Sequence, residues 1–331
     1  MGSTAPQVLV ISTAVDEATD AVVGALHARG ATVHRFNTEE FPFHTGLTMS
    51  WTAGEPSAWL RLPEAEVPLS ALTSCWYRRV RVPLRPVAME AGPYEFAMRE
   101  SRSAVLGLAL SQQMPLMNNP ACTWAAEVKP WQLTAAVRCG LPIPATVITN
   151  DPTKVRAAFS SWAGQMIAKP VRSGYLEEDG VGRAIFTSEV RAGDLADDDA
   201  LACAPAIYQR LVPKRCDVRV TVVGRRVFAA EILSQTDPAA CIDWRRTSNA
   251  RLPHQPATLP VRLEAVLLEL CELLGLQFAA IDLVRTVEDD YVFLEVNPGG
   301  QWLWIEDMLG YPITGSVAEW LLAPPRRAAQ T

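Results

Sequence analysis

The sequence predicts an α/β protein that begins with a small doubly wound domain and continues with α+β parts. Gln7–Ser12 is an apolar run of strand length, and Ala31–Phe36 is a second strand candidate. Asp16–Arg29 between them carries apolar residues at helical spacing and ends before Gly30. A strand, a helix and a strand in this order are typical of a parallel sheet. Farther along, strands come in adjacent pairs separated by helices. No glycine-rich loop follows the first strand, so we predict no dinucleotide site there.

Composition and charge exclude several classes of protein. The 331 residues are 49% hydrophobic and 20% charged, which is ordinary for a globular protein of two or three subdomains. The net charge of -6 argues against general nucleic-acid binding, and no apolar run approaches the roughly 18 residues of a membrane helix. The first residues do not predict a signal peptide. The seven cysteines are scattered without CxxC spacing, so we expect reduced thiols and a cytoplasmic location.

The N-terminal part is expected to continue with meander strands at Leu47–Trp51 and Ala58–Leu62. Cys75–Val82 is predicted to be another strand, with a basic centre in which Arg78 and Arg79 point to opposite faces. Two interpretations remain open. The arginines either protect an edge strand by their charge or face a carboxylate or phosphate of a substrate.

Helices are expected in the middle of the chain. Tyr94–Leu110 is predicted to be a helix with Phe96 among its inward residues. Ala121–Cys139 is predicted to be a helix or a kinked pair, with the break at Pro130. Arg191–Asp199 is acidic and is expected to be irregular.

A lid over a phosphate-bearing ligand is indicated by the next segment. Met166–Pro170 is a short apolar strand that carries Lys169 and precedes the polar, glycine-containing loop Gly174–Arg183. Most lysines lie on the surface, but this one ends an apolar strand. An ammonium group is a suitable point charge for phosphate, and a mobile loop can exclude water.

The C-terminal part is expected to contain a hairpin beginning at Pro213–Val220, in which Asp217 and Arg219 share one face. These two residues either act on a substrate or take part in a cross-strand salt bridge. Leu259–Leu274 follows as an amphipathic helix whose apolar stripe is core.

A metal site is predicted near the end of the chain. Phe278–Val284 and Tyr291–Val296 are strand-like runs joined by an acidic turn. If they pair, Asp282, Glu295 and Asn297 come close together, because residues two apart on a strand share a face. Their oxygen atoms suit Mg²⁺. The alternative is a surface hairpin with solvated acids, but these carboxylates lie within apolar runs, where burial without a partner is costly.

These motifs resemble a known family. IDLV followed by FLEVNPGGQW resembles the metal-binding end of ATP-grasp ligases. VLVIST, RFNTEEFP and WYRRV resemble the N-terminal domain of the ATP-grasp enzymes that mature ribosomal peptides, the graspetide or microviridin-type macrocyclases. The resemblance implies an ATP-grasp fold with an N-terminal pre-ATP-grasp α/β domain at 1–117, an α+β lid subdomain at 118–205 and a C-terminal α+β subdomain with the metal site at 206–331.

The resemblance also implies roles in ATP binding. Lys129 and Lys169 match the lysines that contact the phosphates, and Val171–Arg183 matches the loop that covers them. The adenine would be held by backbone groups of a hinge formed by Gln209, Arg210, Leu211 and Val212. The family's hinge usually opens with an acidic residue, so which side chain here reads the adenine amino group stays open. ATP and Mg²⁺ are the implied cofactors, with Asp282, Glu295 and Asn297 as metal ligands and Asn297 also near the nucleotide.

Roles toward the substrate follow from the same resemblance. Arg219 would reach the transferred phosphate or the acyl group, and Asp217 would orient the peptide. A DWR segment, here Asp243 to Arg245, lies beside the substrate pocket in the peptide-maturing branch, and Arg245 would hold a carboxylate there. Further contacts to substrate are expected from Arg78 and Arg79.

The implied function is ATP-dependent ligation. The substrate would be a precursor peptide that the enzyme recognises through its leader. The enzyme would convert Asp or Glu side chains of the core into acyl phosphates and join them to Thr or Ser hydroxyls as esters or to Lys as amides. One alternative is a ligase for a small amino acid or peptide, similar to glutathione synthetase or glutamate ligases. Another is a non-catalytic ATP-binding scaffold. The resemblance also allows a homodimer.

Overall fold

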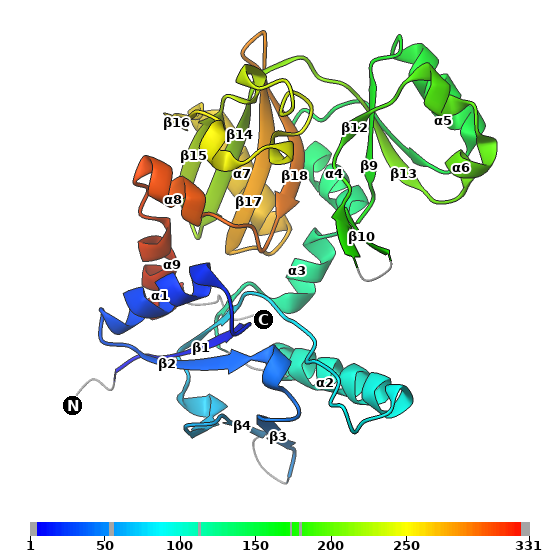
Figure 1. The fold of residues 1–331 in the computed structure, drawn as a ribbon. Helices are drawn as coiled ribbons and strands as arrows, with labels where there is room; N and C mark the ends of the chain where they lie inside the picture. Colours follow the sequence, from blue (N-terminus) through cyan, green and yellow to red (C-terminus); the bar gives the residue numbers. More distant parts are fainter. Residues whose placement is uncertain (1–4, 53–55, 112–113, 173, 179–180, 326–331) are drawn as a thin grey trace.

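The computed structural model describes residues 5–52, 56–111, 114–172, 174–178 and 181–325. These residues form five sheets, and Figure 1 shows them in three regions: an N-terminal domain, a central sheet with its helices, and a lid set to one side. Among the described helices, none combines the length and hydropathy that a membrane span requires.

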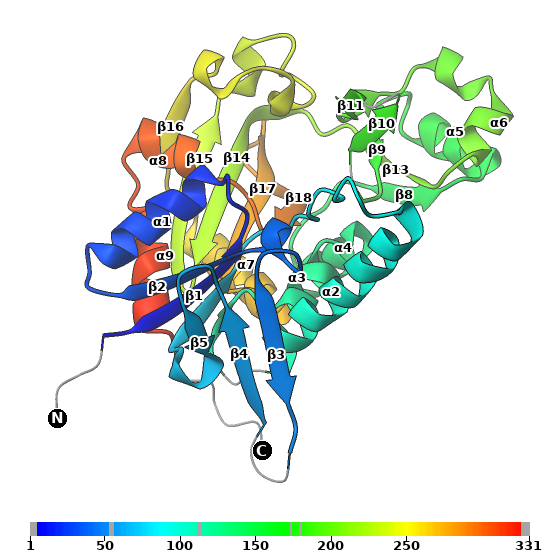
Figure 2. The ribbon, with the colours of Figure 1, turned by 60° about the horizontal axis from the view of Figure 1, so that its bottom comes forward.

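The N-terminal domain is built on a parallel sheet with the strand order β2-β1-β6-β7, which confirms the doubly wound prediction. The strands are β1 (Gln7–Ser12), β2 (Thr32–Asn37), β6 (Ser74–Tyr77) and β7 (Leu116–Met117). One face packs on α1 (Glu17–His27) and α9 (Ile313–Leu322). The other packs on α2 (Ala91–Ser111) and the meander of β3 (Gly46–Ser50), β4 (Ser57–Arg61) and β5 (Glu66–Pro68), as Figure 2 shows.

Two expectations for this domain are wrong. The predicted strand Cys75–Val82 leaves the sheet after Tyr77, because the amide of Arg81 donates to the Thr38 side chain at 2.8 Å instead of to a neighbouring strand. Phe96 was expected to point inward but is 58% exposed, because the first turns of α2 extend beyond the sheet and burial on this helix starts at Met98.

Two helices connect this domain to the lid. They are α3 (Pro120–Ala126) and α4 (Lys129–Arg138), so the break lies at Glu127 and Val128 and not at Pro130. Proline is tolerated in the first turn of a helix because its missing N–H has no intrahelical partner there.

The lid is an antiparallel sheet with the order β12-β9-β13-β8. Its strands are β8 (Thr146–Thr149), β9 (Met166–Pro170), β12 (Ser188–Glu189) and β13 (Ala206–Arg210), and α5 (Pro152–Ser161) and α6 (Asp198–Ala202) accompany it. The hairpin of β10 (Tyr175–Glu178) and β11 (Val181–Ala184) follows β9. Residues 173, 179 and 180 of the predicted phosphate-covering loop lie outside the described residues.

The expectation of an irregular segment at Arg191–Asp199 is wrong. A 3₁₀ turn spans Ala192–Leu195, and α6 begins at Asp198. Leu195 is buried against α5, which gives the turn an apolar anchor.

The central sheet has the order β16-β15-β14-β17-β18, all antiparallel. Its strands are β14 (Lys214–Val223), β15 (Arg226–Ile232), β16 (His254–Ala257), β17 (Phe278–Thr286) and β18 (Tyr291–Asn297). α4 and α7 (Val261–Leu273) cover one face, while α8 (Leu303–Leu309) lies beyond the last strand. The uncovered face of β14, β17 and β18 carries the polar side chains of the predicted metal site.

Candidate active site

The three predicted metal ligands meet on this face. Asp282 of β17 lies opposite Glu295 of β18, and Asn297 is two residues farther along. The amide nitrogen of Asn297 is 3.1 Å from an Asp282 oxygen and 3.4 Å from a Glu295 oxygen. Both carboxylates are buried. The hairpin therefore forms the predicted cluster of oxygen donors.

Four cations surround the two carboxylates: Lys129, Lys169, Arg219 and Arg245. The nearest contact is that of Arg219, which lies opposite Asp282 on β14 and donates to both of its oxygens at 2.8 Å. Arg219 thus forms a cross-strand salt bridge, the alternative predicted for it, at the place where the metal site is expected. Gly300 lies against this pair, because a Cβ there would be 2.9 Å from an Arg219 nitrogen.

The charges of the cluster keep Glu295 ionised. Its oxygens lie 3.3 Å from the Lys129 ammonium and 3.5 Å from the Arg245 guanidinium. Burial opposes ionisation, but the surrounding cations outweigh it and lower the pKa of Glu295 to about 2. Burial also lowers the pKa of Lys169 to about 8.

The donor chemistry fits Mg²⁺, which prefers oxygen ligands and one or two carboxylates. No group of three or more His, Cys, Asp and Glu side chains forms a metal site within the described residues, so the two carboxylates and the Asn297 amide are the candidate set. In the structure the side-chain nitrogen of Asn297 points toward the carboxylates. Rotating the amide by half a turn exchanges its nitrogen and oxygen, so that the oxygen lies on the side of the predicted metal site.

The loop after β18 is held from the N-terminal domain. Arg78 donates to the carbonyls of Gly299 and Gly300 at 2.8 and 3.1 Å and to the Gln301 side chain at 2.8 Å. Its guanidinium also lies 4.6 Å from the ring centroid of Trp302 and 3.7 Å from the carboxylate of Asp16. The Arg78 side chain is 1% exposed and its contacts hold this loop, so its expected contact with substrate stays a prediction.

A second residue of this region acts in the same way. The Asn118 amide donates to the carbonyls of Phe278 and Pro298 at 2.8 and 3.1 Å, and its oxygen accepts from the backbone of Gln277 and Phe278. Arg78 and Asn118 together fix the segment that follows Asn297.

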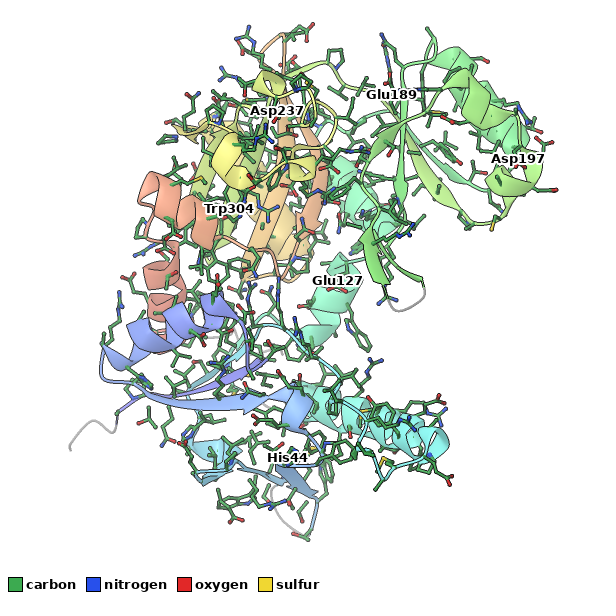
Figure 3. The ribbon with its side chains drawn as sticks, viewed as in Figure 1. His44, Glu127, Glu189, Asp197, Asp237 and Trp304 are labelled. Carbon is green, nitrogen blue, oxygen red and sulfur yellow. The ribbon has the colours of Figure 1, made fainter. Side chains whose placement is uncertain are left out.

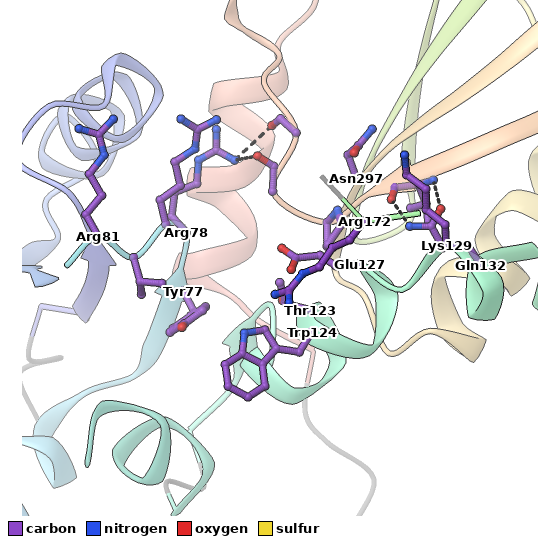
Figure 4. A pocket seen from close by; sticks show the side chains of 16 residues that line it. Tyr77, Arg78, Arg81, Thr123, Trp124, Glu127, Lys129, Gln132, Arg172 and Asn297 are labelled. Carbon is purple, nitrogen blue, oxygen red and sulfur yellow. Dashed lines mark hydrogen bonds between the residues drawn. The ribbon is translucent and has the colours of Figure 1, made fainter. Parts of the chain in front are cut away.

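A cavity of about 570 Å³ opens beside this segment (Figure 4). The N-terminal domain contributes Arg79 and Arg81, the lid contributes Arg172, and the site contributes Lys129 and Asn297. Unlike Arg78, Arg79 has a side chain that is 42% exposed. Positive charge therefore predominates in a cavity that reaches the predicted metal ligands.

Comparison with known proteins identifies the family. Residues 7–122 match the domain described as the MvdD pre-ATP grasp domain. An ATP-grasp ligase associated with RiPPs (ribosomally synthesised peptides that are later modified), from Chryseobacterium gregarium, is 31% identical with a TM-score of 0.90, over 97% of this chain and 98% of that one. Macrocyclase MdnC from Microcystis aeruginosa MRC is 30% identical with a TM-score of 0.85, over 96% and 100%. This chain belongs to the RiPP-associated ATP-grasp ligases.

The resemblance of the sequence motifs to this family and the predicted ATP-grasp fold are thereby confirmed, and the protein is an ATP-dependent ligase. A more distant relative is the ribosomal protein bS6--L-glutamate ligase of Salmonella newport (strain SL254), which is 25% identical over 209 residues, 62% of this chain and 67% of that protein.

In this ligase Asp243 holds Arg245. Asp243 is buried and accepts from Arg245 at 2.9 and 2.8 Å and from the Thr187 amide of the lid at 3.1 Å. Arg246 adds a bond to the Thr187 carbonyl at 2.7 Å. Asp243 therefore fixes Arg245 beside Glu295 and joins that residue to the lid edge, and its expected contact with substrate stays a prediction.

Asp243→Asn is expected to lower kcat by about 10- to 100-fold, the usual cost of losing a residue that orients a metal-site group. The amide can accept from only one side, so Arg245 loses one of its two parallel bonds. Steady-state ligation rates measure the effect, with the exposed Asp199→Asn as the control. A wild-type kcat in Asp243→Asn contradicts this role.

Asp217 likewise has a charged partner within the fold. It is 4% exposed, and both of its oxygens accept from the ammonium of Lys214 at 2.9 and 2.7 Å. Burial raises the pKa of Asp217 although Lys214 opposes the shift. A carboxylate in this setting stabilises this part of the strand, and its expected contact with the peptide stays a prediction.

The predicted hinge leaves two groups available to a nucleotide. The amides of Arg210 and Leu211 donate to carbonyls of the lid, whereas that of Val212 has no partner among the described residues. The side chain of Arg210 is exposed. Gln209 is fully buried and donates to Thr146 at 2.9 Å, and its side-chain oxygen has no hydrogen-bond partner within the described chain.

Sequence reasoning missed three residues that line the cavity: Arg81, Glu127 and Arg172. Arg81 belongs to the basic run Cys75–Val82, and the concentration of arginines there indicates a site for an anion. Glu127 lies at a break between helices, and no spacing rule marks it.

Proposed function

We propose that this ligase activates Asp or Glu side chains of a ribosomal precursor peptide with ATP and joins them to Thr or Ser hydroxyls or to Lys amines, closing macrocycles. The observation that supports this most is that Asn297 of the cluster and Lys129 beside it line a cavity that is also lined by arginines from another domain. A substrate that brings its own carboxylates fits such a cavity.

The chemistry needs two displacements. A carboxylate oxygen of the peptide attacks the γ-phosphorus of ATP and ADP leaves, which gives an acyl phosphate. A hydroxyl oxygen or amine nitrogen then attacks the acyl carbon, inorganic phosphate leaves, and one proton is lost from the nucleophile. Lys129, Lys169 and Arg219 would neutralise phosphate oxygens. Mg²⁺ held by Asp282, Glu295 and Asn297 would supply further charge neutralisation.

The hinge geometry supports an adenine site. The free amide of Val212 would donate to a ring nitrogen, and the unpaired oxygen of Gln209 would accept from the amino group. The side-chain oxygen of Gln209 would thus accept the hydrogen bond that an acidic residue accepts in relatives.

The C. gregarium ligase was solved with ADP and a leader and core peptide, and MdnC with its precursor peptide MdnA. By this likeness we propose that a leader segment docks on the present ligase and delivers a core peptide to the cavity. We also propose a cytoplasmic location, where ATP is abundant, and keep a homodimer as a proposal that sedimentation can test.

The test is mass spectrometry of the precursor peptide encoded beside the gene, after incubation with the ligase, ATP and Mg²⁺. Loss of one water per ring is expected, and base lability marks esters. An unchanged peptide, with ADP formed when glutamate or small peptides are added, favours the alternative of a small-molecule ligase, which the distant glutamate-ligase relative supports.

Arg79→Ala is expected to raise the KM for the peptide by about tenfold to a hundredfold, since a charge-assisted hydrogen bond contributes about 1.5–3 kcal/mol. The KM for ATP should change little, because Arg79 belongs to the N-terminal domain side of the cavity. Separate titrations of peptide and ATP measure the difference, and Arg262→Ala on the exposed side of α7 is the control. Equal changes in both KM values, together with a lower Tm, contradict a substrate role.

A further inference from the structure

Glu127 is the one acid among the described residues that line the cavity next to Asn297, where five cations line the same walls. A neighbouring cavity of about 320 Å³, mostly apolar, is lined by three arginines and again by Glu127 as its one described acid. The two cavities share the side chains of six residues, Tyr77, Val80, Arg81, Trp124, Glu127 and Arg172. Glu127 therefore lies where the two spaces meet.

The chain places Glu127 close to Lys129, whose side chain reaches Glu295. It ends α3, and Lys129 follows two residues later at the start of α4. Two residues span at most about 7 Å of chain, and the Lys129 ammonium is 3.3 Å from Glu295. Figure 3 shows Glu127 at the end of α3.

The Glu127 carboxylate is not used by the fold. It makes no hydrogen bond or ion pair with another described residue, although Arg172 lies beside it in Figure 4. Burial raises its pKa, and the charge of Arg172 opposes the shift. Glu127 is an exposed acid that makes no ion pair within the described chain, and in a cavity that otherwise attracts anions it is placed to meet a group that carries a proton.

We propose that Glu127 is the general base of the second displacement, which rests on the proposed function. The carboxylate of Glu127 accepts the proton of the attacking hydroxyl, or of the attacking amine, as the new C–O or C–N bond forms. The bond between the acyl carbon and the phosphate oxygen breaks, and inorganic phosphate leaves with that electron pair. The arginines of the cavity hold the carboxylate partner, and Glu127 serves the acceptor side.

Hydroxylamine separates the two displacements, because it is a strong nucleophile that traps an acyl phosphate as a hydroxamate without a base. With precursor peptide, ATP and Mg²⁺, Glu127→Gln is expected to form hydroxamate and ADP near the wild-type rate. Ring closure without hydroxylamine should fall by about 10²- to 10⁴-fold, the usual contribution of a general base. Glu127→Asp, which keeps a carboxylate, should retain part of the ring closure.

The exposed Glu100→Gln on α2 is the matched control, and it should close rings like the wild type. Wild-type ring closure by Glu127→Gln overturns the proposal, and so does an equal loss of hydroxamate and rings, which would place Glu127 in binding or activation. Absence of hydroxamate with the wild-type ligase refutes the proposed function itself, and the role of Glu127 with it.

Discussion

Glu295→Gln is expected to give a folded ligase whose kcat is lower by about 10²- to 10³-fold, the scale seen when one preorganised electrostatic group is lost. The amide keeps the shape of the side chain, and the hairpin pairing around Asp282 does not depend on its charge. What is lost is the anion that the Lys129 and Arg245 cations surround, and with it one of the oxygen donors of the proposed Mg²⁺ site.

The measurement is the rate of ADP release at rising Mg²⁺ concentration. Glu288→Gln is a matched control, because Glu288 is exposed in the turn of the same hairpin. The Tm should stay within a few degrees of the wild type, which separates lost chemistry from unfolding. An active Glu295→Gln enzyme would remove this residue from the metal site.

Arg78→Ala is expected to destabilise the fold by about 3–5 kcal/mol, since it removes the buried partner of a buried carboxylate and leaves only Arg79, whose side chain is 42% exposed. Asp16 is that carboxylate: one oxygen caps α1, and the other has no hydrogen bond within the described chain and lies 3.7 Å from both Arg78 and Arg79. The carbonyls of Gly299 and Gly300 lose their donor as well.

Arg78→Lys separates stability from positioning. It keeps the charge beside Asp16, but a single ammonium cannot reach both carbonyls and the Gln301 side chain as the planar guanidinium does. We expect a folded enzyme that needs more Mg²⁺ for half-maximal activity, because the segment after Asn297 is held less firmly. Denaturant unfolding and Mg²⁺ titration are the two readouts. Unchanged unfolding of Arg78→Ala, or an unchanged Mg²⁺ requirement of Arg78→Lys, argues against this clamp.

The parts of the site that depend on strand periodicity could be predicted from the sequence. Asp282, Glu295 and Asn297 converge because two apolar runs with a short acidic turn pair in the expected way. The same rule also places Arg219 on the correct face. The division of the chain at 117 and 205 stays a prediction.

The partners of the charged side chains could not be predicted, because spacing does not say which partner a charged side chain finds in the fold. Arg78 meets Asp16, 62 residues earlier in the chain, and Asp217 is neutralised by Lys214 only three residues away. Glu127 lines the cavity only because α3 and the lid pack around it. These contacts depend on tertiary packing, which local pattern does not encode.

The contacts of Arg78 and Asn118 with the segment after β18 determine how this ligase can be recombined with its relatives. A chimera that takes its first 117 residues from another enzyme separates Arg78 from the carbonyls at 299 and 300, although the two stretches are some two hundred positions apart. Transplanting Pro298–Trp302 with the N-terminal domain restores the native pairing. Engineers who wish to change peptide preference by exchanging that domain should therefore treat these two distant stretches as one inherited unit.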